Sequence, residues 1–271
     1  MNSSKTVRAL VESAMMVALA TVLSIFKMVD MPYGGSVTIA SMLPMIILAY
    51  RQGALWGLGS GLTYAVIQQL LGLNTLSYVT GWQSVVAVIL LDYIIAFTLV
   101  GLGGVFRKAC KSQRGALIAG ASLVSALRYV CHVISGATVW KGLSIPDEAA
   151  LIYSIGYNAT YMIPETIILV AVAYYLGGII DFSRPVPIRT ASEHLTQKES
   201  SLYLLSGASF LLGGIIDVWL IAPTLQDEET GKFIFEGLAN ADWMAVAVVT
   251  VLTVALGIAL AFTAKKSNQK D

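Results

Sequence analysis

Charge is what this sequence has least of. Of its 271 residues, 56% are hydrophobic and only 12% are charged, whereas an ordinary soluble domain is about 25% charged. So few charges cannot cover the surface of a water-soluble domain. The net charge of +1 also argues against nucleic acid as a partner, because phosphate binding needs a clustered basic surface. The composition therefore predicts an integral membrane protein whose surroundings are the lipid bilayer.

Residues that hold metals, cofactors or nucleotides are equally scarce. The two cysteines, Cys110 and Cys131, and the two histidines, His132 and His194, are scattered along the chain, so neither a disulfide nor a metal site is expected. No G-x-x-x-x-G-K-[ST] motif occurs, which excludes a P-loop. We expect no metal and no cofactor, and any ATP must be hydrolysed by a partner.

Long uncharged stretches show how the chain is organised. Gln52–Leu91 contains no Lys, Arg, Asp or Glu, and as one helix it would be about twice as long as the roughly 30 Å of bilayer hydrocarbon. The apolar runs are too long and too continuous for the alternating strands of a membrane barrel. The predicted fold class is all-α, with helices at about 7–28, 37–50, 53–72, 82–106, 115–139, 149–181, 199–222 and 242–264.

The basic residues predict the orientation of these helices. If the N-terminus lies in the cytoplasm and every helix crosses, only Lys27, Lys141 and Lys232 fall outside, Arg128 lies within a span, and the other thirteen of the 17 Lys and Arg fall inside. This distribution follows the positive-inside rule. We therefore expect a multi-pass protein of the cell membrane with both termini cytoplasmic.

Proline and charge mark a boundary late in the chain. The stretch 183–198 is polar and contains Pro185 and Pro187, which break helices. We interpret 1–182 as a six-helix domain, 183–198 as a cytoplasmic linker and 199–271 as a two-helix appendage of unknown role. The second helix of the first domain is short and contains Pro44, so it is expected to be tilted, broken or only partly spanning.

Polar side chains inside apolar spans are costly and are therefore the candidates for function. Asp92 stands in an apolar run next to Tyr93, and it either pairs with Arg128 or awaits a cationic or amide-bearing ligand. His132 follows Arg128 at i, i+4, and its alternatives are a hydrogen-bonded core histidine or the wall of a polar cavity. Trp140 ends the same helix and belongs either to that cavity or to the aromatic belt of the membrane.

The sixth predicted helix adds a second set of polar residues. Asn158 and Glu165 are seven residues apart and share a face, and Glu165 lies about as deep as Arg128, so we predict an ion pair between these two. Tyr153 lies near the outer end, close to Trp140. Together a carboxylate, an imidazole, a carboxamide and aromatic rings suit a small, flat, partly cationic heteroaromatic ligand.

Four motifs, in order, carry a resemblance to a known family. They are Pro32-Tyr-Gly-Gly-Ser-Val-Thr-Ile39, Leu91-Asp-Tyr-Ile-Ile-Ala-Phe97, Leu127-Arg-Tyr-Val-Cys-His-Val-Ile-Ser-Gly136 and Ile152-Tyr-Ser-Ile-Gly-Tyr-Asn-Ala-Thr-Tyr-Met-Ile-Pro164. Over residues 1–182 the chain resembles the thiamine-specific substrate-binding (S) components of energy-coupling factor transporters. The resemblance implies a six-helix, non-enzymatic subunit that captures thiamine and docks on a transmembrane coupling protein driven by two ATPase subunits.

The resemblance also assigns roles to individual residues. Trp140 would stack on the aminopyrimidine, Asp92 and Asn158 would bond its edge, and His132 would lie beside the thiazolium. The family's docking face on the first helix is matched by Ala14 and Ala18, whose small-residue spacing equally suits packing within the protein. Two departures from the family pattern are Asp92, where some members have Glu, and a missing Trp near Gly35. The implied thiamine-binding residues are Gly35, Ser36, Tyr64, Asp92, Tyr93, His132, Trp140, Tyr153 and Asn158.

Three other functions compete with thiamine capture. An S component for another heteroaromatic vitamin, or for a thiamine precursor, would use the same cavity. An intramembrane enzyme with Asp92 and His132 as acid and base would need a second carboxylate, a metal set or an activated nucleophile nearby, and none is evident. A purely structural membrane protein would leave the buried Asp92, His132 and Asn158 unexplained.

Overall fold

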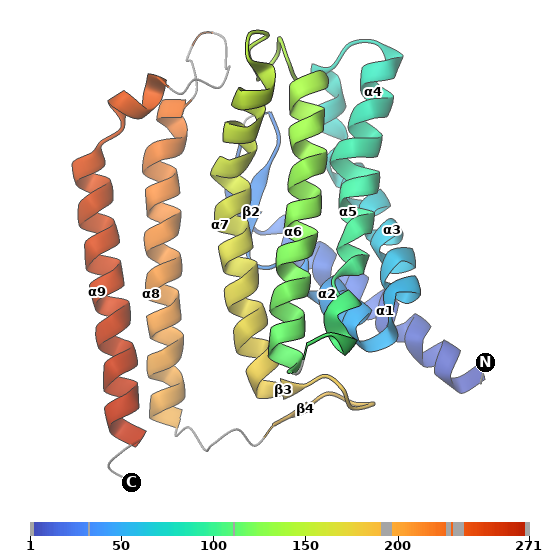
Figure 1. Cartoon of the computed structure of the whole chain (residues 1–271), viewed down its shortest axis with the longest axis vertical. Helices are drawn as coiled ribbons and strands as arrows, with labels where there is room; N and C mark the ends of the chain where they lie inside the picture. Colours follow the sequence, from blue (N-terminus) through green and yellow to red (C-terminus); the bar gives the residue numbers. More distant parts are fainter. Residues whose placement is uncertain are drawn as a thin grey trace. The chain divides into compact units, whose positions relative to one another are not determined.

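The protein is described here by a computed structural model of the whole chain, in which residues 3–31, 33–110, 112–190, 197–225, 229 and 236–268 are described. It is mainly helical and divides into two compact units. The first contains the elements from α1 to β4, in blue to yellow in Figure 1, and the second contains α8 and α9, in orange and red. His194 lies outside the described residues.

Each range that hydropathy predicts contains helix, although residues 37–42 at the start of the second range are not helical. In the first unit the long helices are α1 (Ser3–Ile25), α3 (Ala54–Leu71), α6 (Gln113–Thr138) and α7 (Ala150–Ile179), together with a helical segment from Trp82 to Lys108. Five helices of the described chain are long and apolar enough to cross a membrane, namely Ser4–Ile25, Trp82–Lys108, Gln113–Thr138, Ala150–Ile179 and Trp243–Leu260. The prediction of a mostly helical, multi-pass membrane protein is confirmed.

The short second helix lies at the centre of the first unit. Helix α2 (Leu43–Gln52) is about 15 Å long at about 1.5 Å per residue, and all its residues from Leu43 to Tyr50 are buried. Pro44 stands in its first turn. Backbone N–H groups of the first turn have no partner within the helix, so the N–H that proline lacks costs no hydrogen bond there. At Gly53 a φ of 92° ends α2 before α3 begins. Proline therefore starts α2 and does not break it.

The segment from Trp82 to Lys108 changes its helical type several times. It consists of α4 (Trp82–Val88), a π-helical turn η2 (Ile89–Ile95), α5 (Ala96–Thr98), and the 3₁₀ turns η3 (Leu99–Leu102) and η4 (Val105–Lys108). A π turn inserts a residue into the helical repeat and is frequent at functional sites. Gly101 lies against α3 so closely that a Cβ on it would come within 2.2 Å of the Gly57 carbonyl oxygen.

A β-hairpin replaces part of the first predicted connection. The stretch 27–38, around the connection between the first two predicted helices, forms β1 (Lys27–Asp30) and β2 (Ser36–Thr38), which pair antiparallel. The turn requires φ values of 106° at Gly34 and 91° at Gly35, which glycine adopts without strain. A purely helical fold class is therefore wrong in this detail, because two glycines and short β-favouring runs close a hairpin between α1 and α2.

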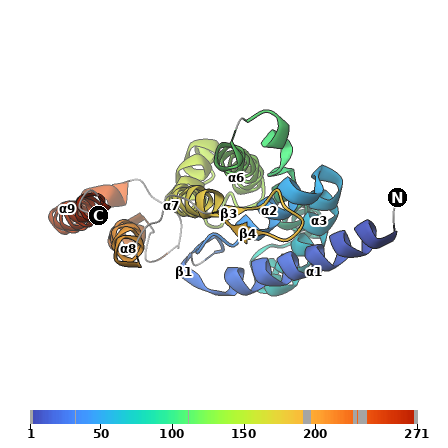
Figure 2. The ribbon, with the colours of Figure 1, turned by 90° about the horizontal axis from the view of Figure 1, so that it is seen from below.

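A second small hairpin lies at the opposite end of the first unit. Strands β3 (Ile180–Asp181) and β4 (Ile188–Arg189) pair antiparallel, and Figure 2 shows them across the end of α2. Arg51, at the end of α2, bonds Glu12 of α1 and the carbonyl oxygens of Phe182 and Arg184. Hydrogen bonds from Ser183 hold the pKa of Asp181 below its usual value. The first part of the predicted linker 183–198 is therefore structured.

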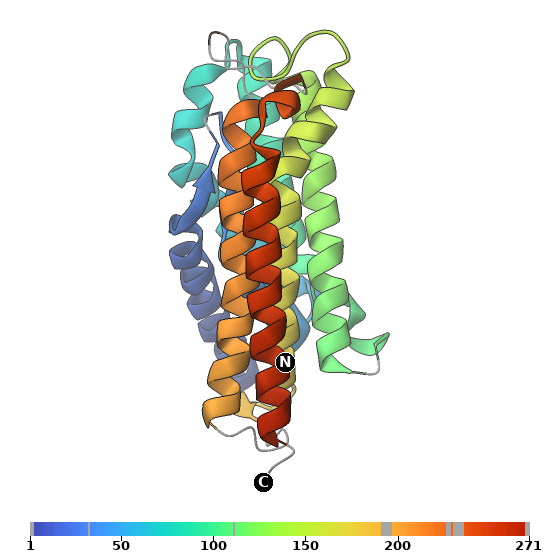
Figure 3. The same ribbon diagram turned by 90° about the vertical axis from the view of Figure 1, so that its left-hand side faces the viewer.

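The second unit is a pair of antiparallel helices (Figure 3). Helix α8 (Gln197–Ile221) and the turn η5 (Ala222–Leu225) precede the turn η6 (Glu236–Asn240) and α9 (Trp243–Asn268). Hydroxyls of Ser206 and Ser209 donate to the carbonyl oxygens of Gly257 and Thr253, each at 2.7 Å. Thr250 donates to Asp217 at 2.7 Å. The two helices thus pack through a stripe of small polar residues, while apolar side chains face outward.

Candidate functional site

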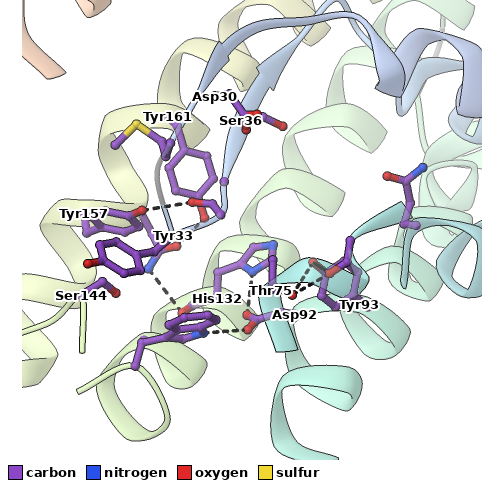
Figure 4. A pocket seen from close by; sticks show the side chains of 18 of the residues that line it. Asp30, Tyr33, Ser36, Thr75, Asp92, Tyr93, His132, Ser144, Tyr157 and Tyr161 are labelled. Carbon is purple, nitrogen blue, oxygen red and sulfur yellow. Dashed lines mark hydrogen bonds and ion pairs between the residues drawn. The ribbon is translucent and has the colours of Figure 1, made fainter. Parts of the chain in front are cut away.

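A cavity of about 400 Å³ lies in the first unit (Figure 4). Its walls come from the end of α1, the β1–β2 hairpin, the end of α3 with the 3₁₀ turn η1 (Leu73–Tyr78), the π turn η2, α6, α7 and the connection between α6 and α7. Most of the predicted ligand-binding residues line it. They are Gly35, Ser36, Asp92, Tyr93, His132, Trp140 and Asn158.

The Asp92 carboxylate is the centre of a hydrogen-bond network in one wall. His132 Nδ1 lies 3.0 Å from Oδ1, and Ser135 Oγ and Trp140 Nε1 donate to Oδ2 at 2.7 and 3.0 Å. Because a carboxylate only accepts, the proton shared with His132 belongs on Nδ1. The side chains of Asp92 and His132 are each 13% exposed. The π turn therefore places the Asp92 carboxylate against α6 and the residues that follow it, where three hydrogen-bond donors hold it in place.

Asn158 of the neighbouring helix α7 is held in the same way. Its amide nitrogen donates to Ser154 O at 2.9 Å and to His132 O at 3.3 Å, and its Oδ1 accepts from Tyr161 Oη at 2.6 Å. Ser154 Oγ in turn donates to Val133 O at 2.8 Å. These bonds join α6 to α7, so the carboxamide is fixed with its own oxygen and nitrogen already engaged.

Aromatic residues attach the β1–β2 hairpin to the cavity. Tyr157 Oη donates to Gly34 O at 3.0 Å, and Gly35 lies against the Tyr161 ring so closely that a Cβ would come within 2.7 Å of it. Tyr33 and Tyr78 meet edge to face with centroids 5.4 Å apart. The hairpin is thus connected to α7 on one side and to η1 on the other.

An ion pair closes the inner end of the cavity. Arg128 Nη1 lies 3.0 Å from Glu165 Oε2, with side chains that are 7% and 5% exposed. Thr38 of β2 donates to Glu165 Oε1 at 2.8 Å, and the Arg128 guanidinium lies over the Phe97 ring at 4.7 Å. The predicted Arg128–Glu165 pair is confirmed. The alternative pairing of Arg128 with Asp92 is wrong, because the carboxylate of Asp92 is bonded by its nearer neighbours on α6.

Two of the residues implied by the resemblance do not line this cavity. Tyr64 is fully buried and packs edge to face on Phe97 at 5.5 Å, which places it behind the wall. Tyr153 is half-buried near the start of α7. On α1, Ala14 and Ala18 are exposed. The described residues contain no cluster of His, Cys, Asp and Glu suited to a metal, and Cys110 and Cys131 are free.

Several residues of the site could not be assigned from the sequence. Thr75 bonds Tyr93 at 3.0 Å, and Tyr33, Tyr78 and Tyr157 also line the cavity. The tyrosines of α7 lie within one of the recognised motifs, and their i, i+4 spacing is a usable signal. Tyr33 and Tyr78 come from separate connections, and only the folded chain brings them together.

Comparisons with known proteins place this architecture in a family. The thiamine transporter protein family matches residues 10–180. Thiamine transporter ThiT of Bacillus subtilis (strain 168) is 41% identical over 181 residues, which are 62% of this chain and 89% of that protein. ThiT of Lacticaseibacillus paracasei is 24% identical over 188 residues, covering 64% and 88%.

A solved structure shows the same fold. ThiT from Listeria monocytogenes superposes with a TM-score of 0.52 and 22% identity, over 64% of this chain and 94% of that one. The family match ends where β3 begins, so α8 and α9 lie outside it. The resemblance read from the motifs is confirmed: this chain belongs to the thiamine transporter protein family, a family of transporters and not of enzymes, and is a multi-pass protein of the cell membrane.

Proposed function

We propose that this protein is the high-affinity thiamine-binding subunit of an ATP-driven importer of the energy-coupling factor type. The observation that carries the proposal is the wall in which Asp92 fixes both the Trp140 indole and the His132 imidazole, inside a cavity of about 400 Å³, in a member of the thiamine transporter protein family. An indole held at its Nε1 presents a rigid face on which a heteroaromatic ring can stack.

The charges around the cavity suit a cationic ligand. Lys27 and Asp30 neutralise each other at 3.0 Å in the β1 wall, and Arg128 is neutralised by Glu165. Asp92 is bonded by neutral hydroxyl and indole donors besides His132. When His132 is neutral, the walls therefore carry a net negative charge, which attracts a thiazolium ring.

We infer that the ligand enters from outside the cell. In this proposal the first unit crosses the membrane six times, the crossing that contains the short α2 being only partly helical, α8 and α9 add two more, and both termini lie in the cytoplasm. The positive-inside distribution of Lys and Arg supports this orientation. The cavity then faces the outside of the cell. The Tyr33–Tyr78 contact and the Tyr157–Gly34 hydrogen bond close it on that side.

Release needs a partner in this proposal. Exposed Ala14 and Ala18 on α1 form a smooth surface on which a transmembrane coupling protein can dock, and two ATPase subunits supply the energy that a chain without a P-loop cannot. A ligand is released only in a state that binds it less tightly. Docking must therefore deform the cavity.

Tryptophan fluorescence tests the ligand assignment. Purified protein is titrated with thiamine, and saturable quenching is expected because the ligand stacks on Trp140. The Trp140→Phe variant should lose the quenching, whereas Trp82→Phe, at a site that is 73% exposed, should retain it. Saturable quenching by another heteroaromatic vitamin or by the free aminopyrimidine, without any by thiamine, would reassign the subunit to that ligand.

Uptake measurements test the docking face. Replacing Ala14 or Ala18 by Trp should abolish thiamine uptake by cells that contain the coupling module and leave binding by the purified subunit unchanged. Leu55→Trp, at an exposed site on α3 (88% exposed), is the matched control and should transport normally. Loss of binding together with uptake would show that this face packs within the protein.

A further inference from the structure

We propose that Arg51 is a positioning residue for ligand release, because it joins α1, the helix proposed to dock, to the hairpin that closes the cavity. The link runs through the short helix α2, which has Arg51 at one end and follows the hairpin strand β2 at the other. This inference rests on the proposed function and deepens it, because it concerns how docking on α1 reaches the cavity.

The Arg51 guanidinium uses all of its hydrogen-bond donors. Nε and Nη2 donate to the two carboxylate oxygens of Glu12 on α1. Nη1 donates to the carbonyl oxygens of Phe182 and Arg184 at 2.6 and 2.9 Å, and Nη2 also donates to that of Pro185 at 3.0 Å. These bonds occupy the five N–H groups of an arginine, and the side chain of Arg51 is only 5% exposed. Helix α2 therefore ends in a fixed contact with both α1 and the β3–β4 hairpin.

Glu12 places this contact on the face of α1 that is opposite the predicted docking residues. It precedes Ala14 by two residues, which is about 200° around a helix of about 3.6 residues per turn. The side chain of Glu12 is 13% exposed, whereas Ala14 and Ala18 are exposed. Gln52, the last residue of α2, donates to the same carboxylate at 2.6 Å. A partner that binds the exposed face of α1 and displaces this helix therefore moves the end of α2 with it.

Helix α2 can transmit such a displacement because its surroundings leave it no freedom of its own. All its residues from Leu43 to Tyr50 are buried, and close-packed interiors have low compressibility and transmit strain. Arg107 of η4 donates to the carbonyl oxygens of Tyr50 and Arg51 at 3.0 and 2.9 Å, two of the carbonyls that the end of a helix leaves without a partner. Helix α2 is therefore a short, rigid link.

The other end of α2 is tied to the hairpin and to the inner end of the cavity. Strand β2 ends at Thr38, whose carbonyl oxygen accepts from Ala40 N at 3.0 Å. Ala40 has a φ of 52°, which residues other than glycine rarely adopt, so the connection from β2 to α2 is tight. Thr38 Oγ1 donates to Glu165 at 2.8 Å, and Arg128 Nη1 donates to Met42 Sδ at 2.9 Å. Displacement of α2 therefore moves the hairpin and disturbs the ion pair at the same time.

Thiamine affinities with and without the coupling module test the proposal. The readout is the Kd of the docked full-length protein divided by the Kd of the free protein. In the wild type we expect a ratio of about ten or more, because docking must weaken binding for release to occur. Glu12→Ala separates α1 from Arg51 and Gln52 but keeps the bonds of Arg51 to the β3–β4 hairpin. Its ratio should be near one, and its Kd as a free subunit should be unchanged.

Two further variants give a second test and a matched control. Arg51→Lys keeps the positive charge but cannot form five bonds from one planar group, so its ratio should also fall towards one. Asp181→Asn removes the exposed ion pair between Asp181 and Arg184 in the β3–β4 hairpin and leaves the five bonds of Arg51 in place. Its ratio should equal that of the wild type.

The outcomes separate this inference from the proposed function. A Glu12→Ala complex that weakens thiamine binding as much as the wild-type complex does would overturn the inference, while thiamine capture would still stand. A Glu12→Ala subunit that no longer binds thiamine, or no longer docks, would also overturn it. A wild-type subunit that binds no thiamine, or whose affinity the coupling module leaves unchanged, would refute the proposed function instead. If Arg51→Lys does not fold, Glu12→Ala decides the question.

Discussion

The Glu165→Gln substitution isolates the energy of the ion pair at the inner end of the cavity. The substitution keeps the size of the side chain but removes the negative charge, which lies 3.0 Å from Arg128. Both side chains are more than nine-tenths buried. Removing one partner of a buried pair leaves an uncompensated charge and costs about 3–5 kcal/mol. With about 2–4 °C per kcal/mol for a unit of this size, the melting temperature should fall on the order of 10 °C.

The assay is thermal unfolding of the purified protein in detergent, with a matched control on the same chain. Arg184 and Asp181 form a pair at the same distance of 3.0 Å, but their side chains are 60% and 24% exposed. Solvent screens such a pair, so Asp181→Asn should leave the melting temperature unchanged. The double variant Arg128→Met, Glu165→Leu should recover much of the loss, because no buried charge remains. Equal melting temperatures for Glu165→Gln and Asp181→Asn would refute this reasoning.

Two glycines give further predictions. Gly35→Ala should weaken thiamine binding at least tenfold, because φ is 91° and the new methyl would come within 2.7 Å of the Tyr161 ring. Calorimetric titration measures the change in Kd. An unchanged Kd would mean that the hairpin does not close the cavity. Gly213→Leu should separate α8 from α9, since a Cβ there would lie 2.2 Å from Thr253 Oγ1, and protease sensitivity of the second unit should rise while thiamine binding is retained. Unaltered proteolysis would show that this close approach does not hold the pair together.

The sequence was sufficient to predict the helices, because charge is absent where the chain crosses the membrane and frequent where it leaves it. It also pointed to Asp92, His132, Trp140 and Asn158, since polar groups in apolar spans need a reason to be there. The Arg128–Glu165 pair could be predicted from matching depth alone. These inferences use composition and helical spacing, which are local properties of the chain.

What the sequence could not provide is the arrangement of side chains between elements. The pairing of Asp92 with His132 and Trp140 depends on the π turn, which shifts the helical register in a way that a 3.6-residue period does not predict. The hairpin at 27–38 depends on the backbone angles of Gly34 and Gly35. The Tyr33–Tyr78 contact joins two separate connections. Tyr64 and Tyr153 were carried over from the family resemblance, which does not specify which side chains face the cavity.

Isothermal titration of the purified full-length protein with thiamine tests the central claim most directly. The account predicts saturable binding of one thiamine per chain, with a heat that disappears in the double variant Asp92→Ala, Trp140→Ala, which removes the fixed wall of the cavity. The absence of saturable heat in the wild type, at thiamine concentrations far above those of the protein, would contradict it.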